Sequence, residues 1–333
     1  MYFNKNYNIL NLSLLIILFL SFFLSLSVNN INSSLEFFAE GVFYNSDLSK
    51  EIIFYDIKLP RTILGVLTGA TLGLCGAAIQ GLFRNPLAEP GIIGVSSTAS
   101  LGSVIVLYFG LTGAYSFLLP FGGLVGAFIA VITIFILAGK NSSTLTLILS
   151  GVAINAFAAS MTSLFLNLAP SPYAALEIIF WILGSIADRD FGDILIALPL
   201  IFGGWILLLG VGKGLDALTL GEDIAKSLGI NTKLLKIKII LSTALSVGAT
   251  VSITGGISFV GLIVPHLIRP LVKYEPSKIL FPSAIGGAII VLLSDILVRL
   301  IPTNIELKLG VITAIIGAPF FLYLILYNKR NLH

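Results

Sequence analysis

The sequence predicts an all-α polytopic membrane protein with about ten transmembrane helices. Apolar residues make up 57% of its 333 residues and charged residues only 11%, and the mean hydropathy is +1.04. Soluble domains are typically about 45–50% apolar and about 25% charged. This composition excludes a soluble globular protein. The net charge of only +3 gives no indication of a nucleic-acid partner.

Apolar stretches of about 17–25 residues, long enough to cross a bilayer, define the helices in chain order. We expect them at 9–28, 61–83, 91–111, 115–138, 144–168, 191–211, 237–254, 256–272, 279–300 and 308–327. The first stretch is longer than the roughly 7–15 apolar residues of a secretory signal and lacks a small-x-small cleavage site, so we expect a retained helix. Repeated glycines, such as Gly65, Gly69 and Gly73, favour close helix packing.

Residues 1–333 are therefore expected to form a single transmembrane domain. Within it, 1–28 hold the first helix, 29–60 an outer loop, 61–211 helices two to six, 212–236 a cytoplasmic segment, and 237–328 the last four helices. With the N-terminus inside, basic residues concentrate in the cytoplasmic loops, which is the usual bias. The six placed outside are Lys50, Lys58, Arg61, Arg189, Arg299 and Lys308. Both termini are then cytoplasmic.

A polar island, residues 213–238, interrupts the apolar spans and falls on the cytoplasmic side. Its apolar residues recur at helical spacing and its charges take the other face. The apolar set is Leu220, Ile224 and Leu228 with Ala225 beside them, and the charged set is Glu222, Asp223 and Lys226. Gly229 and Asn231 end the helix. An amphipathic element held between spans predicts a docking site for a cytosolic protein; the alternative is an inert helix on the membrane surface.

No catalytic or metal-binding constellation is evident. His266 has no second histidine near it in the sequence, Cys75 stands alone in an apolar span, and no G-x-x-x-x-G-K-[ST] phosphate loop occurs. Asp295 is the one carboxylate well inside a span. It precedes Arg299 by four residues, which predicts an ion pair on one helix face. The alternative is a proton relay, because ionisable groups inside membranes are often functional.

Two blocks of sequence resemble the FecCD family, the permease subunits of ABC importers for iron–siderophores, haem and vitamin B12. The first runs from Lys58-Leu-Pro-Arg61 through Gln80-Gly-Leu-Phe-Arg84-Asn85-Pro86-Leu87 to Ser96. The second contains Gly261-Leu-Ile-Val-Pro265-His266 and Gly310 to Phe320. With the island included, the similarity covers roughly residues 55–328. Only the first helix and outer loop lack distinctive motifs.

The resemblance implies the permease fold of a type II ABC importer in a prokaryotic cytoplasmic membrane. Two permeases, identical or paralogous, would form the pathway for a metal chelate. Two cytoplasmic ATPase subunits would bind ATP and Mg²⁺, so this chain is expected to be no enzyme and to hold no cofactor. A substrate-binding protein would deliver the cargo from outside. We expect an iron–siderophore, with haem or vitamin B12 as alternatives.

The resemblance also assigns residues to roles. Those matching the ATPase-docking stretch are Leu220, Gly221, Glu222, Ile224, Ala225, Leu228 and Gly229. Those matching cations that receive the binding protein are Lys58, Arg61 and Arg299, although Lys58 replaces the usual arginine and lacks its bidentate fork. Snorkelling at the interface is the alternative for these cations. Asn85, Leu87 and Thr144 match the cytosolic gate. A secondary transporter driven by an ion gradient is the competing class, but apart from Asp295 its required ionisable groups are missing from the spans.

Overall fold

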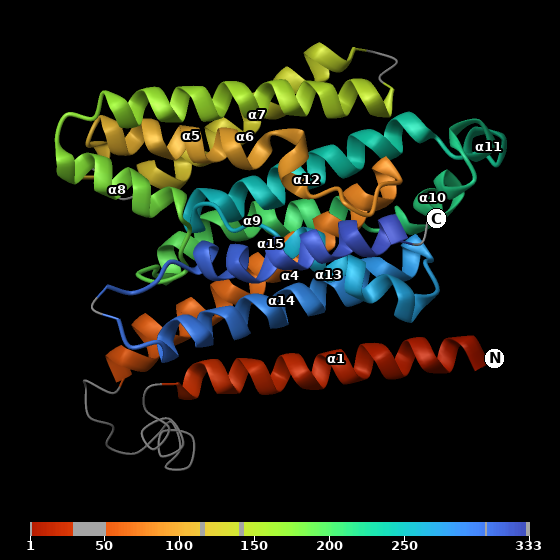
Figure 1. The fold of residues 1–333 in the computed structure, drawn as a ribbon, viewed down its shortest axis with the longest axis horizontal. Helices are drawn as coiled ribbons and strands as arrows, with labels where there is room; N and C mark the ends of the chain where they lie inside the picture. Colours follow the sequence, from red (N-terminus) through yellow and green to blue (C-terminus); the bar gives the residue numbers. More distant parts are fainter. Residues whose placement is uncertain (1, 29–50, 114–116, 140–142, 304, 331–333) are drawn as a thin grey trace.

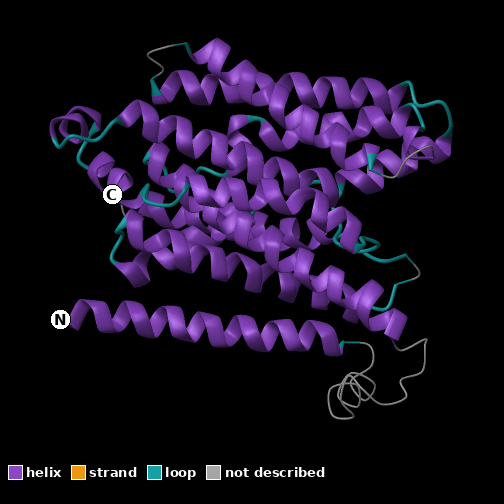
Figure 2. Ribbon diagram, turned by 180° about the vertical axis from the view of Figure 1, so that it is seen from behind, coloured by secondary structure: helices purple, strands orange, loops and turns teal. Residues whose placement is uncertain are grey.

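The computed structural model describes residues 2–28, 51–113, 117–139, 143–303 and 305–330, and within these ranges all regular structure is helical (Figures 1 and 2). The α-helices are α1 (Tyr2–Ser27), α4 (Leu59–Phe83), α5 (Val95–Tyr108), α6 (Leu118–Ala138), α7 (Thr144–Asn167), α8 (Pro172–Ile182), α9 (Phe191–Leu207), α10 (Gly212–Thr219), α11 (Glu222–Ser227), α12 (Thr232–Thr254), α13 (Val260–Ile268), α14 (Pro276–Leu300) and α15 (Leu309–Arg330). Short helical turns cover Ile53–Lys58, Pro90–Ile93, Leu111–Gly113 and Arg269–Val272.

Each predicted span coincides with a helix of the structure. By length and composition, six helices in the described chain are able to cross a membrane, or seven if α9 and α10, bent by 50°, count as one. Four further apolar segments are shorter: Val95–Tyr108, Pro172–Ile182, Val260–Val272 and Leu309–Tyr323. The all-helical fold is confirmed, whereas the number ten stays a prediction. Helix α8 was not predicted, because its 11 residues fall below the length expected of a span.

The structure differs from the expected outer loop at residues 53–60. A π-helical turn, Ile53–Lys58, runs directly into α4, whose second residue is Pro60. The apolar stretch predicted a start at residue 61, and Pro60 fits the first turn of the observed helix. The turn before it extends the helix instead. Residues 29–50 of the expected loop lie outside the described residues.

The long helices run roughly parallel or antiparallel in one bundle, with α1 along one edge beside α14 and α7 along the opposite edge (Figure 1). The start of α1, the end of α15 and helices α10 and α11 lie at one end, on the right in Figure 1. We call this the island end. The start of α4 and the end of α14 lie at the other end, which we call the outer end. The polar island, expected in the cytoplasm, and the helix ends that carry Arg61 and Arg299, expected outside, are therefore at opposite ends of the bundle.

Glycines bring α4 and α14 into close contact, as predicted from their spacing. A Cβ atom built on Gly69 would lie 2.3 Å from the main-chain oxygen of Gly287, and one on Gly73 would lie 1.9 Å from that of Ser283. Contacts this short leave no room for any side chain. The small residues thus serve helix packing.

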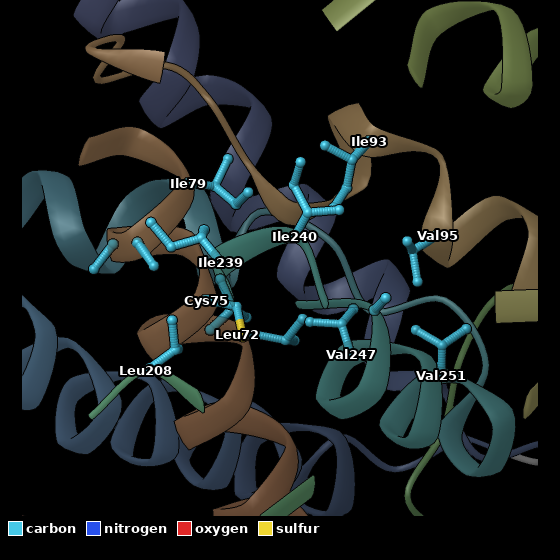
Figure 3. Packing of buried hydrophobic residues seen from close by; sticks show 14 of the residues in the cluster. Leu72, Cys75, Ile79, Ile93, Val95, Leu208, Ile239, Ile240, Val247 and Val251 are labelled. Atoms are coloured by element: carbon cyan, nitrogen blue, oxygen red, sulfur yellow. The ribbon is translucent and has the colours of Figure 1, made fainter. Parts of the chain in front are cut away.

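The core lies where α4 and α12 meet. Figure 3 shows Leu72, Cys75 and Ile79 of α4 beside Ile239, Ile240 and Val247 of α12. Cys75 is fully buried, and its Sγ lies 3.2 Å from the Oγ of Ser246. Helix α12 packs against α4, α5, α6 and α9, and α4 packs against α12, α13 and α14, so these two helices form the centre of the described bundle.

Candidate docking sites at the two ends of the bundle

The polar island folds as two short helices rather than one. Helix α10 ends at Thr219, and Gly221, with φ of 116°, separates it from α11. Glycine is suited to this turn because the conformation is closed to most L-residues. A second glycine in the left-handed region, Gly229, ends α11 with φ of 82°, and the side chain of Asn231 accepts a hydrogen bond from the main-chain nitrogen of Leu234, which caps α12. The predicted break at these two residues is confirmed.

Three apolar side chains project from this segment into the surroundings. Leu220 is 59% exposed, Ile224 50% and Leu228 60%, whereas Ala225 on the other side of α11 is fully buried. The sequence predicted one helical face for the three large residues with Ala225 beside them. The structure exposes all three, but Leu220 precedes the break at Gly221, and Ala225 is buried. We call Leu220, Ile224 and Leu228 the docking face. An apolar face at the polar end of a membrane protein is costly to leave in water and marks a contact surface.

Glu222 does not project with the docking face. The Nζ of Lys236 in α12 donates hydrogen bonds to both oxygens of its carboxylate, at 3.0 Å to Oε1 and 3.1 Å to Oε2. Lys236 is only 7% exposed. Partial burial acts to raise the pKa of Glu222, but the hydrogen bond and charge of Lys236 outweigh it and lower that pKa from its ordinary value. Glu222 therefore fastens α11 to α12 in this structure.

At the outer end, Asp295 of α14 forms ion pairs with two arginines. Nε and Nη2 of Arg61 in α4 donate hydrogen bonds of 2.9 and 2.7 Å to Oδ1 of Asp295. Nη2 of Arg299 is 2.9 Å from Oδ2, and this predicted pair on one helix face is confirmed. The second contact is an ion pair without aligned hydrogen-bond geometry, because the guanidinium of Arg299 is directed at Ser25 of α1, with 2.8 Å to its main-chain oxygen and 2.6 Å to its Oγ.

Lys58 belongs to the same outer-end cluster. Its Nζ donates a 3.0 Å hydrogen bond to the main-chain oxygen of Leu26 in α1, and the side chain is buried. Arg61 also pairs with Glu306, which is the most exposed charged residue of this group, at 40%. The structure thus brings Lys58, Arg61 and Arg299 together as predicted, but it directs their charges to partners within the chain. A docking role for them stays a prediction.

The predicted gate residues lie in two segments near the island end. Asn85 and Leu87 follow the end of α4, where Oδ1 of Asn85 accepts a 2.9 Å hydrogen bond from the main-chain nitrogen of Leu87. This bond closes the turn. Thr144 is the first residue of α7, capped by Ser143. No hydrogen bond links Thr144 to Asn85 or Leu87 in the described structure, so their joint role as a gate stays a prediction.

A polar niche that the sequence did not reveal lies between the α4–α5 connection and α13. The cavity has a volume of about 450 Å³, and its polar lining includes Glu89, Ser97, Asn155 and Ser258. Oγ of Ser97 donates to Oδ1 of Asn155 over 2.6 Å, and Nδ2 of Asn155 donates to the main-chain oxygen of Gly91 over 2.8 Å. Sequence spacing gives no signal for it, because these four polar residues come from separate parts of the chain: the α4–α5 connection, α5, α7 and the connection before α13.

The described residues offer no group of three or more His, Cys, Asp or Glu side chains that would hold a metal ion. His266 lies instead beside Phe320, with ring centroids 6.1 Å apart. The long apolar helices of the described bundle define a multi-pass membrane protein. A docking role for the exposed residues Leu220, Ile224 and Leu228 stays a prediction.

Comparison with known proteins identifies the family. The model of the FecCD transport family matches residues 15–327, so the chain belongs to this family. It is 38% identical to an uncharacterized ABC transporter permease protein, YvrB, of Bacillus subtilis, over 84% of this chain and 80% of that protein. It is 35% identical to the hemin transport system permease protein HmuU of Yersinia pestis, over 84% of each. Other relatives are named as cobalamin and Fe(3+)-citrate import permeases.

A solved structure supports the same assignment. A chain described as an inward-facing metal-chelate type ABC transporter superposes with a TM-score of 0.80 and 30% sequence identity, over 96% of this chain and 99% of that one. The resemblance seen in the sequence is thus confirmed, and with it the permease fold.

Proposed function

We propose that this chain is the membrane-spanning subunit of an ATP-driven importer and that its cargo is an iron–siderophore, such as a ferric hydroxamate. The observation that carries the ATP-driven part is the docking face, where Leu220, Ile224 and Leu228 are exposed at the polar end of an apolar bundle. The relatives support it, since they are ABC transporter permeases. The chain would contribute the pathway, and ATP hydrolysis would take place in a separate subunit.

The proposed assembly contains two permeases, either two copies of this chain or this chain with a paralogue. Two ATPase subunits dock on the island end in the cytosol, and a substrate-binding protein docks on the outer end. This arrangement is supported by the separation of the docking face from Lys58, Arg61 and Arg299 at opposite ends of the bundle. The membrane is then the cytoplasmic membrane of a prokaryote, and both termini are cytoplasmic, in agreement with the distribution of Lys and Arg.

The iron–siderophore is the finer part of the proposal. Relatives are named for hemin, cobalamin and Fe(3+)-citrate, which are all metal chelates. Haem and vitamin B12 are therefore the alternative cargoes. The polar niche at Glu89, Ser97 and Asn155 is a candidate place for contact with the polar rim of such a chelate, because it offers hydroxyl, amide and carboxyl groups in an otherwise apolar bundle.

An ion-gradient mechanism is disfavoured by the surroundings of Asp295. A proton carrier must be reached by protons, yet the side chain of Asp295 is 1% exposed and forms ion pairs with Arg61 and Arg299. The gradient and ATP mechanisms are separated by inactivating the partner ATPase and, in a parallel sample, collapsing the proton gradient.

The test is uptake of radioiron-labelled ferric hydroxamate into vesicles that carry this chain with its cognate ATPase and binding protein. We expect uptake that requires ATP, stops when the ATPase is inactivated and persists without a proton gradient. An excess of unlabelled haem or cobalamin should leave the uptake of the ferric hydroxamate unchanged. Uptake abolished by the loss of the gradient alone contradicts the proposal, and ATP-driven uptake of haem or cobalamin instead of the hydroxamate overturns only the choice of cargo.

A further inference from the structure

Helix α11 is joined to the rest of the molecule by few contacts. It has six residues, Gly221 and Gly229 flank it in conformations that favour glycine, and Ala225 is its buried residue. A helix this short is unstable by itself and depends on tertiary contacts. A movement of α11 can therefore be transmitted to the rest of the molecule by three routes: the packing of Ala225, the flanking turns, and the contact of Glu222 with α12.

The Glu222 contact is the strongest of these by its chemistry. Both carboxylate oxygens are within 3.1 Å of the Nζ of Lys236, and Oγ1 of Thr232 lies 3.5 Å from Oε1. Lys236 is nearly buried, so water screens this pair less than an exposed one. Lys226 also approaches Glu222, at 3.6 Å, but its side chain is 54% exposed and such pairs contribute little.

Helix α12 is suited to carry motion from this pair into the bundle. Lys236 lies in its second turn, and most of its 23 residues are buried. Along its length α12 packs against α4, α5, α6 and α9. Packed helices move as rigid bodies, because their interiors are too dense to absorb the displacement locally.

We propose that the Glu222–Lys236 ion pair is the link that transmits movement of the docking helix α11 to helix α12, and so couples ATP hydrolysis to transport. The inference rests on the proposed docking of an ATPase at α11. Both residues act as positioning residues: neither touches the cargo, and Glu222 is turned away from the docking face. Breaking the pair leaves the docking face in place but lets α11 move without α12.

The test compares Glu222→Gln, Lys236→Met and the charge exchange Glu222→Lys with Lys236→Glu, each in proteoliposomes with the cognate ATPase and binding protein. Three quantities are measured: ATPase co-purified with the permease, ATP hydrolysed, and cargo taken up. In both single variants we expect co-purification near the wild-type level and continued hydrolysis, with uptake per ATP reduced roughly tenfold. The charge exchange should restore at least part of the uptake per ATP, since it restores the ion pair.

Lys226→Met is the matched control, because it removes the exposed neighbour of Glu222 and leaves Lys236 in place. We expect wild-type coupling. Unchanged uptake per ATP in Lys236→Met overturns the inference, and so does loss of ATPase co-purification in both single variants, which would make the pair part of the docking site. If an ATPase fails to co-purify even with the wild-type chain, the proposed function itself is wrong, which distinguishes the two failures.

Discussion

Arg61 and Asp295 are 234 residues apart in the sequence, yet two nitrogens of the Arg61 guanidinium donate hydrogen bonds to the same carboxylate oxygen, at 2.9 and 2.7 Å. The pair joins the first turn of α4 to the last turns of α14. Arg299 extends it to α1 through Ser25, so three helices are fastened at the outer end. The carboxyl group that the sequence offers as a possible proton carrier is thus a structural ion-pair centre.

Asp295→Asn should destabilise the protein strongly. Removal of one charge from a buried ion pair typically costs about 3–5 kcal/mol, because the remaining charges stay buried without compensation, and Asp295 is 1% exposed between two arginines. We expect a clearly lower midpoint of thermal unfolding in detergent. Glu306→Gln is the control: this carboxylate also pairs with Arg61 but is 40% exposed, so the shift should be small. Equal shifts in the two variants would contradict this account.

Gly73→Ala should separate α4 from α14. The added Cβ would lie 1.9 Å from the main-chain oxygen of Ser283, and main chain cannot yield as a flexible side chain does. We expect loss of the folded, monodisperse protein in fluorescence-detected size-exclusion chromatography. Gly203→Ala in α9 is matched to it, because nothing lies within 4 Å of its Cβ position. That variant should keep the wild-type profile, and a normal profile for Gly73→Ala would show that the two helices are farther apart than described.

The pair of Glu222 and Lys236 should persist under mild acid. The pKa of Glu222 is lowered from its ordinary value, so the carboxylate stabilises the folded state at pH values above the unfolded pKa, about 4.3, and that stabilisation is lost as the pH falls through the lowered folded pKa. Hydrogen exchange of the α11 amides, corrected for intrinsic rates, should show constant protection from pH 7 to about pH 5 and a loss only below about pH 4. Lys236→Met should reduce the protection already at pH 7 and remove most of its dependence on pH, because the charge that lowers the pKa of Glu222 is gone. A wild-type loss between pH 5 and 7 would be inconsistent with the pair.

Much of the fold follows from hydropathy alone. The predicted spans match α4, α6, α7, α12 and α14 to within a few residues, because apolar stretches of bilayer length leave few alternatives. The exceptions are short or interrupted elements. Helix α8 has only 11 residues, and the turn at Ile53–Lys58 carries Asp56 and Lys58 before a proline, so it lacks the signal of a span.

Contacts between residues of one helix could be predicted from their spacing in the sequence. Contacts between different helices could not, because they depend on the tertiary fold. The i,i+4 rule identified the pair of Asp295 and Arg299. Helical periodicity predicted that Leu220, Ile224 and Leu228 share a face; all three are exposed, but Gly221 interrupts the helix between Leu220 and Ile224. The resemblance assigned Glu222 to the docking stretch, and this role stays a prediction. Only the tertiary fold reveals that the Glu222 carboxylate pairs with Lys236 of α12, beyond the Gly229 turn. Similarly, only the fold reveals that Lys58 and Arg61 have partners inside the chain and that Arg299 also contacts Ser25.

The central claim is that a soluble ATPase binds the docking face. Its most direct test is co-purification of the cognate ATPase with the double variant Ile224→Asp and Leu228→Asp, compared with Asp223→Asn on the same helix. Ile224 and Leu228 are half or more exposed, so the double variant should insert and fold normally, while a charge in an apolar interface weakens binding by about 1–3 kcal/mol per residue. We predict that the ATPase and ATP-dependent uptake are lost with the double variant and retained with Asp223→Asn, whose side chain is fully exposed. Wild-type amounts of ATPase bound to a correctly inserted double variant would contradict the claim.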